Sequence, residues 1–108
     1  TYTITDLPNL DELRPHIDRI DADLYALLAE RFRVTHQVGV YKAAHNIPPI
    51  DPAREEVQFA RVARLATENG LDPDFAKKVL RLIIDEVVKN HEILAQKQGW
   101  SAPWNCLY

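Results

Sequence analysis

A positive charge interrupts an otherwise apolar helical pattern in the first part of the chain. Apolar residues recur there at alternating spacings of three and four, typical of a helix face packed on another helix: Leu10, Leu13, Ile17, Ile20, Leu24, Leu27, Val34, Val38 and Tyr41. The same register expects an apolar residue at Arg31. Because burying a guanidinium without an anion is very costly, Arg31 must have a carboxylate partner, from this protein or from a ligand.

Helix geometry relates two other cations to Arg31. Lys42 lies eleven residues later, close to three full turns, so it projects from nearly the same face about 16 Å along the axis. Gly39 allows either a close approach of another helix or space for a ligand. Arg14 lies about 25 Å from Arg31 and points to a different side, so it reaches the same site only from a second, antiparallel chain. Taken alone, Arg14 is more typical of a solvated surface arginine.

Further charges stand on the two later helical segments. Asp51, Arg54 and Glu55 share one helical turn and can converge on a common spot. A capping aspartate followed by an exposed Arg–Glu pair explains them equally well. The last segment contains another apolar seam, made of Leu80, Ile84, Val87, His91 and Leu94. A histidine in such a core-type position is more often a satisfied core residue than a catalytic one. Arg81 and Lys89 are typical of solvated charges.

Start and stop signals predict three helices that carry these residues. The Asn9–Glu12 pair resembles a capping box, Asp51–Pro52 and Asp72–Pro73 are typical helix starts, and Gly70 and Gly99 are natural stops. The predicted helices cover about residues 9–45, 52–68 and 73–98. Since no segment alternates like a strand, the expected fold class is all-α.

The first predicted helix is too long for a single chain of this size to cover. About 36 residues make a rod of about 55 Å, roughly twice the diameter of a domain whose radius of gyration is about 13 Å. Two shorter helices cannot bury that whole stripe, whereas a second copy can, so we expect a homodimer in which the two long helices pair. Antiparallel pairing would give two equivalent sites per dimer, each using both chains. The alternative is a break near residues 31–34, which gives a monomeric four-helix bundle.

Composition limits the remaining possibilities. The 108 residues and 46% hydrophobic content fit one domain over residues 1–108, with a core of about 9–98 and an apolar tail over 99–108 to which we assign no chemistry. The net charge of −3 does not favour nucleic acid or an anionic membrane as a partner. The single cysteine excludes an intrachain disulfide and gives no metal-site spacing. With no signal-like start and no apolar span, the expected location is the cytoplasm.

The order and spacing of these residues are similar to a known family. Three segments at 13–14, 17–21 and 27–31, reading Leu-Arg, Ile-Asp-Arg-Ile-Asp and Leu-Leu-Ala-Glu-Arg, resemble the first helix of the all-helical chorismate mutases, and Lys42 follows at the expected interval. The segment 49–55 resembles the family's Asp-x-x-Arg-Glu signature, and 83–87 resembles its third helix. The resemblance covers about residues 9–97. No motif is specific by itself, but the ordered combination is.

The resemblance implies an intertwined homodimer that converts chorismate to prephenate, a pericyclic step in aromatic amino-acid synthesis, without cofactor or metal. Arg31, together with Arg14 of the partner chain, would bind substrate carboxylates. Lys42 would donate to the ether oxygen and a neighbouring carboxylate. Such a site works by holding the substrate in a compact, chair-like conformer and by stabilising negative charge on the ether oxygen.

The second helix would supply the rest of the site. The resemblance implies that Arg54 helps to close it, while Asp51 and Glu55 hold the ring hydroxyl of the substrate. Two third-helix positions depart from the family. His91 stands where Gln or Glu usually gives a second donor to the ether oxygen, and Val87 stands where a small polar residue is usual, so a contact is lost there.

A neutral imidazole can take the place of the usual donor, since it also offers one N–H. Positive neighbours such as Lys42 and Arg31 disfavour the imidazolium, so we expect His91 to be neutral near pH 7.

Two other functions share these features. An isochorismate pyruvate-lyase has this fold and much of the cationic site, although the Asp51-x-x-Arg54-Glu55 turn favours the mutase. A non-catalytic helical dimer would instead pair its cations with glutamates on the helices: Glu30, Glu55 and Glu86.

Overall fold

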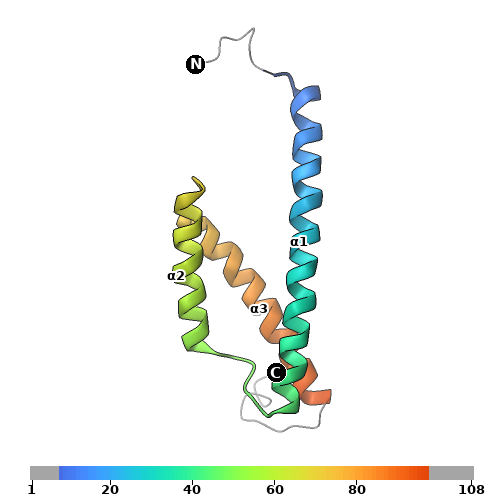
Figure 1. Ribbon diagram of the computed structural model, residues 1–108, viewed down its shortest axis with the longest axis vertical. Helices are drawn as coiled ribbons and strands as arrows, with labels where there is room; N and C mark the ends of the chain where they lie inside the picture. Colours follow the sequence, from blue (N-terminus) through green and yellow to red (C-terminus); the bar gives the residue numbers. More distant parts are fainter. Residues whose placement is uncertain (1–7, 98–108) are drawn as a thin grey trace. The chain divides into compact units, whose positions relative to one another are not determined.

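Three helices make up the computed structural model, which describes residues 8–97 (Figure 1). They are α1 (Leu10–Ala44), α2 (Pro52–Glu68) and α3 (Pro73–Lys97). Each boundary lies within one residue of the predicted one, and the described part of the chain contains no strand, so the all-α prediction is confirmed. The predicted stop at Gly99 and the apolar tail lie outside the described residues.

Short polar side chains begin all three helices, as predicted. In each case a side-chain oxygen accepts a backbone N–H of the first turn that has no partner within the helix. The bonds are Asn9 Oδ1 with Glu12 N at 3.0 Å, Asp51 Oδ1 with Arg54 N at 3.1 Å, and Asp72 Oδ1 with Asp74 N at 3.0 Å. Pro52 and Pro73 are the first helical residues, where the missing proline N–H costs nothing.

A left-handed residue ends both α1 and α2. Asn46 has a φ of 55°, and the N–H of Ile47 reaches back to the carbonyl of Lys42 at 2.8 Å. Gly70, with a φ of 72°, has the same role after α2. Both ends form the longer hydrogen bond of a Schellman motif, Ile47 N to Lys42 O and Leu71 N to Ala66 O, which satisfies a carbonyl left open in the last turn. The sequence indicated this role for Gly70 but not for Asn46.

α1 continues without interruption through residues 31–34, so the four-helix alternative is wrong. The helix also contains Pro15, whose missing N–H removes one helical hydrogen bond. By its internal contacts the chain falls into two compact units, Thr1–Arg33 and Val34–Tyr108, with the boundary inside α1.

The apolar stripe predicted along α1 is exposed over its whole length. Every one of its nine residues is between 41% and 63% exposed: Leu10, Leu13, Ile17, Ile20, Leu24, Leu27, Val34, Val38 and Tyr41. Contiguous apolar surface of this extent marks an interaction site in a water-soluble protein. The single chain therefore does not bury this stripe, as the length argument expects.

The core of the second unit is made of small residues and one face of α3. α2 packs on α3 (Figure 1). The buried residues of α3 recur at helical spacing and include Ala76, Leu80, Ile84, His91 and Ala95. α1 contributes Gly39 and Ala43 to the buried set, and α2 contributes Ala66.

Gly39 allows α1 and α3 to approach closely. A Cβ atom at this position would lie 2.5 Å from Cδ2 of His91 and 2.8 Å from Cδ1 of Leu94. Real Cβ atoms essentially never come so close to another atom, so any larger residue forces the imidazole ring aside. Of the two roles considered for this glycine, close helix packing is the one observed.

We expect Gly39→Ala to lower the free energy of unfolding by about 1–2 kcal/mol, because overpacking against His91 outweighs the gain in helix propensity. Chemical denaturation measures this. His91→Gln, which replaces the ring with a flexible side chain, should restore most of the loss in the double variant. Gly70→Ala is the control, since a Cβ there meets nothing within 4 Å and its cost is backbone strain that His91→Gln leaves unchanged. Equal losses from Gly39→Ala with and without His91→Gln would contradict the packing explanation.

Candidate active site

Lys42 lies at the end of α1, where its ammonium meets the segment that leads to α2. The side chain is half-buried, and its Nζ donates a hydrogen bond to the carbonyl oxygen of Pro49 at 3.3 Å. An ammonium has three donors, so this bond leaves donors for a ligand. Lys42 is thus a held cation beside the turn that begins with Asp51.

His91 is buried between α3 and α1. The residue is 4% exposed, and its Nε2 lies 2.8 Å from the carbonyl oxygen of Thr35. Because a carbonyl oxygen can only accept, Nε2 must carry the hydrogen, and the neutral ring then has a lone pair at Nδ1. Nδ1 is buried and has no hydrogen-bond partner among residues 8–97. The sequence predicted a donor here, yet the donor is already used on Thr35.

The pKa of His91 is lowered from its ordinary value of 6.5. Burial is the largest cause, because it disfavours the charged ring. The hydrogen bond with Thr35 opposes this, while the positive charge of Lys42 and the neighbouring His36 lower the pKa further. The predicted neutral state is therefore supported, but its main cause is burial rather than the neighbouring cations.

The three charges in the first turn of α2 have different partners. Asp51 caps the helix and Arg54 is exposed, as expected if Asp51 is a capping residue followed by exposed charges. The expected exposed pair of Arg54 with Glu55 does not form. Instead the Glu55 carboxylate, 19% exposed, turns towards α3 and accepts a hydrogen bond from Arg81.

Arg81 is a bridge between helices rather than the solvated charge that the sequence indicated. Its Nη2 lies 3.2 Å from Oε1 of Glu55, and its Nη1 lies 3.3 Å from Oδ1 of Asp85. The guanidinium also lies over the ring of Phe59, 4.7 Å from the ring centre, which is a cation–π contact. Burial lowers the pKa of Arg81, but its bonds to Asp85 and Glu55 outweigh this and raise it overall.

Only part of this bridge is visible in the sequence. The Arg81–Asp85 spacing of four residues is a common helical ion pair. The contacts with Glu55 and Phe59 cross from α3 to α2, so no local pattern predicts them. Lys89 does behave as predicted, with a side chain that is 67% exposed and 3.9 Å from Glu86.

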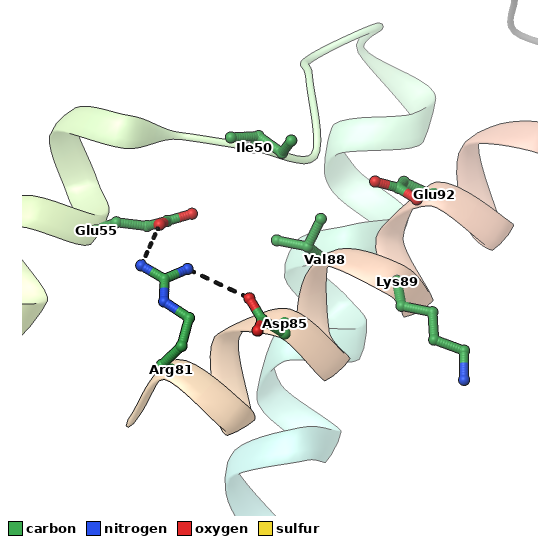
Figure 2. A pocket seen from close by; sticks show the side chains of 7 residues that line it. All are labelled: Ile50, Glu55, Arg81, Asp85, Val88, Lys89 and Glu92. Atoms are coloured by element: carbon green, nitrogen blue, oxygen red, sulfur yellow. Dashed lines mark hydrogen bonds and ion pairs between the residues drawn. The ribbon is translucent and has the colours of Figure 1, made fainter. Parts of the chain in front are cut away.

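A pocket of about 460 Å³ lies between the first turn of α2 and the middle of α3 (Figure 2). Figure 2 shows the Arg81 guanidinium between Glu55 and Asp85, while the Lys89 side chain points away from them. Glu92 also lines the pocket and is only 4% exposed. The sequence assigned no role to Glu92, because a charged residue beside a core position looks like any solvated helix residue.

The remaining predicted site residues lie on α3 and in the other unit. Val87 is half-buried on α3. Arg14 and Arg31 belong to the other unit, Thr1–Arg33, in which Arg14 is exposed and Arg31 is half-buried with its Nη1 atom shielded from solvent. The structure thus brings His91 to the α1–α3 contact, Lys42 to the segment before α2, and Glu55 to the pocket. No hydrogen bond or ion pair joins Lys42 to Glu55.

Within residues 8–97 there is no group of three or more side chains suited to hold a metal ion. No helix in that range is both long and apolar enough to cross a membrane.

Several known proteins are similar in sequence to this chain over most of its length. A 4-amino-4-deoxychorismate mutase from Streptomyces venezuelae is 26% identical over 99 residues, which cover 92% of this chain and 96% of that protein. A protein of the same name from Streptomyces pristinaespiralis is 34% identical over 80 residues, covering 74% and 62% respectively. A chorismate mutase from Methanocaldococcus jannaschii is 32% identical over 92 residues, covering 85% of this chain and 88% of that protein.

A family model described as chorismate mutase type II matches residues 13–92, which include all eight predicted site positions. With this match and these relatives, the chain belongs to the type II chorismate mutase family.

Proposed function

We propose that this protein is a chorismate mutase that rearranges chorismate to prephenate and works as a homodimer. The observation that carries this proposal is the family match over residues 13–92, because it spans every residue to which the sequence assigns a role. A cytoplasmic location and a single domain over the whole chain stay predictions.

Two arginines bind the substrate carboxylates in this proposal. Arg31 serves one of them from its own chain, and Arg14 of the partner chain serves the same site across the interface. A guanidinium presents paired N–H groups that match a carboxylate, so it fixes position as well as charge. Holding both ends of a flexible dianion favours the compact conformer in which the reacting atoms meet.

Lys42 is the proposed donor to the ether oxygen, where negative charge develops as the C–O bond breaks. Its anchoring to Pro49 supports this role, because a fixed cation needs no reorganisation during the reaction. His91 is proposed to lie nearby. For His91 to donate there, Nδ1 must take up a proton or Nε2 must leave Thr35. Lys42 needs neither change, so we assign it the main electrostatic role.

The first turn of α2 holds the ring hydroxyl in this proposal. Asp51 uses Oδ1 for the helix cap, which leaves Oδ2 to accept from a substrate. Glu55 supplies a second acceptor, and the exposed Arg54 is free to fold over the bound substrate. Val87 offers only apolar contact at its position.

The exposed stripe on α1 supports the homodimer. A second copy placed antiparallel would cover the stripe with an identical one and would bring Arg14 of each chain towards the Arg31–Lys42 half of the other. Such a two-fold interface is self-complementary, so it creates two equivalent sites.

The printed names of the relatives raise a second candidate substrate. Two of them are called 4-amino-4-deoxychorismate mutases, and that compound carries an amine where chorismate has its ring hydroxyl. The isochorismate pyruvate-lyase reaction is a third possibility for this fold.

Incubating the protein with each substrate and identifying the products by NMR tests the function. We expect prephenate from chorismate and no pyruvate or salicylate from isochorismate. Arg31→Ala is the negative control, because loss of a carboxylate contact should lower kcat/KM at least about a hundredfold. Salicylate and pyruvate from isochorismate, without prephenate from chorismate, would contradict the proposal, and turnover of none of the three compounds would support the non-catalytic dimer.

Mixing two inactive variants tests the shared site. Arg14→Ala and Arg31→Ala homodimers should each be nearly inactive. After unfolding and joint refolding, half of the dimers carry one chain of each kind, and one of their two sites contains both native arginines. We therefore expect recovery of about a quarter of the native activity at equal mixing.

The same mixing shows how the proposal fails. If both arginines of a site came from one chain, every site in a mixed dimer would lack one of them. No activity would then return.

The buried state of His91 predicts a loss of stability in mild acid. Because its folded pKa lies below the ordinary 6.5, the unfolded chain binds this proton more readily than the folded one. Above pH 6.5 His91 is neutral in both states, so its protonation does not affect the free energy of unfolding. Below it, the free energy of unfolding falls as pH decreases, by at most about 1.4 kcal/mol per pH unit.

His91→Gln removes this titrating side chain, so comparison with wild type separates the effect of His91 protonation from that of other titrating groups. We expect wild type to lose more stability than His91→Gln between pH 7 and pH 5, measured by chemical denaturation at one protein concentration. Parallel pH profiles for the two proteins would contradict the buried, neutral histidine.

A further inference from the structure

Three contacts fix the charge of Arg81 at the α2–α3 contact. Its guanidinium donates to Glu55 and to Asp85 from different nitrogens and lies against the Phe59 ring. A guanidinium is a rigid planar fork with five donors, so it can satisfy both carboxylates at once. The Arg81 side chain is 47% exposed, but the three contacts leave it little freedom to turn away.

Arg81 occupies only one side of the Glu55 carboxylate. The bond is to Oε1, and Oε2 accepts no hydrogen bond from the described residues. An ionised carboxylate has about four lone-pair sites, so Oε2 can still accept from a ligand. Glu55 is therefore an acceptor whose negative charge is already compensated.

This compensation distinguishes a hydroxyl from an ammonium. A hydroxyl needs only an acceptor, and Oε2 provides one. An alkyl amine is protonated near neutral pH, as lysine is, so it gains most beside an uncompensated carboxylate. With a guanidinium 3.2 Å from Oε1, an ammonium at Oε2 would lose part of that attraction and meet a like charge.

We propose that Arg81 is a positioning residue that holds Glu55 and makes the site prefer a ring hydroxyl to a ring ammonium. The inference rests on the proposed function, in which Glu55 receives the ring substituent of the substrate. It assigns chorismate, rather than its 4-amino analogue, as the preferred substrate of this chain.

The neighbouring charges set the direction of the effect. Two of the carboxylates that line the pocket, Glu55 and Asp85, are paired with Arg81. Besides Arg81, the pocket-lining cation is Lys89, which is 67% exposed and lies 3.9 Å from Glu86. Removing the charge of Arg81 therefore leaves the Glu55 carboxylate without its compensating cation, which favours a cationic ring substituent at Oε2.

The test compares kcat/KM for chorismate with kcat/KM for 4-amino-4-deoxychorismate. We expect wild type to prefer chorismate, and Arg81→Gln to shift the ratio towards the amino compound by about tenfold or more. Arg81→Lys keeps the charge and should retain most of the preference. Arg64→Gln is the matched control, because Arg64 also pairs with a glutamate on α2 but lies in an exposed pair with Glu68, and we expect no shift.

A purely structural role for Arg81 would lower turnover of both substrates alike and leave their ratio unchanged. Circular dichroism checks the fold of each variant. If Arg81→Gln does not fold, Arg81→Lys becomes the test: loss of the preference for chorismate in this variant, which keeps the charge, would contradict an effect of charge. A Glu55→Gln background adds a second measurement, since Arg81→Gln should no longer shift the ratio there.

The outcomes separate the two proposals. An unchanged ratio in Arg81→Gln, with chorismate still converted, overturns the role of Arg81 and leaves the proposed function intact. A shift that persists with Glu55→Gln, or a wild type that prefers the amino compound, also overturns this role. Turnover of neither substrate by wild type overturns the proposed function and the role of Arg81 together.

Discussion

The apolar stripe of α1 is longer than the rest of one chain can bury. Nine residues along it are exposed, and α1 does not break to shorten it. Exposed apolar surface costs free energy in proportion to its area, about 25 cal/mol per Å², so a stripe of this length favours self-association strongly. The need to cover this stripe is the basis of the proposed dimer. The proposed place of Arg14 in the partner's site and the two sites per dimer follow from that dimer.

Close contact between α1 and α3 governs the chemistry available to His91. Because Gly39 has no side chain, the imidazole ring lies against the backbone of α1, where Thr35 offers an acceptor. That bond selects the tautomer and leaves a buried lone pair at Nδ1. A histidine in this position therefore helps to hold two helices together. In the proposed site Lys42, unlike His91, could donate without rearrangement.

At the start of α2, the partners of two carboxylates decide how much of their negative charge is left for a ligand. Asp51 is partly used by the backbone of its own helix, whereas Glu55 is used by another helix through Arg81. Two carboxylates on one turn thus have different surroundings. A capped aspartate keeps its position whichever ligand binds, but the effective charge of Glu55 depends on a residue twenty-six positions away.

The sequence by itself determined the three helices to within one residue, because the capping residues, the prolines that follow two of them and the glycine stop after α2 are local signals. It also determined the apolar stripe, since periodicity depends only on helix geometry. The partners of individual side chains were decided by tertiary structure: Arg81 with Glu55, His91 with Thr35, and Lys42 with Pro49. Contacts between helices depend on how closely those helices pack, and no spacing along one helix encodes that distance.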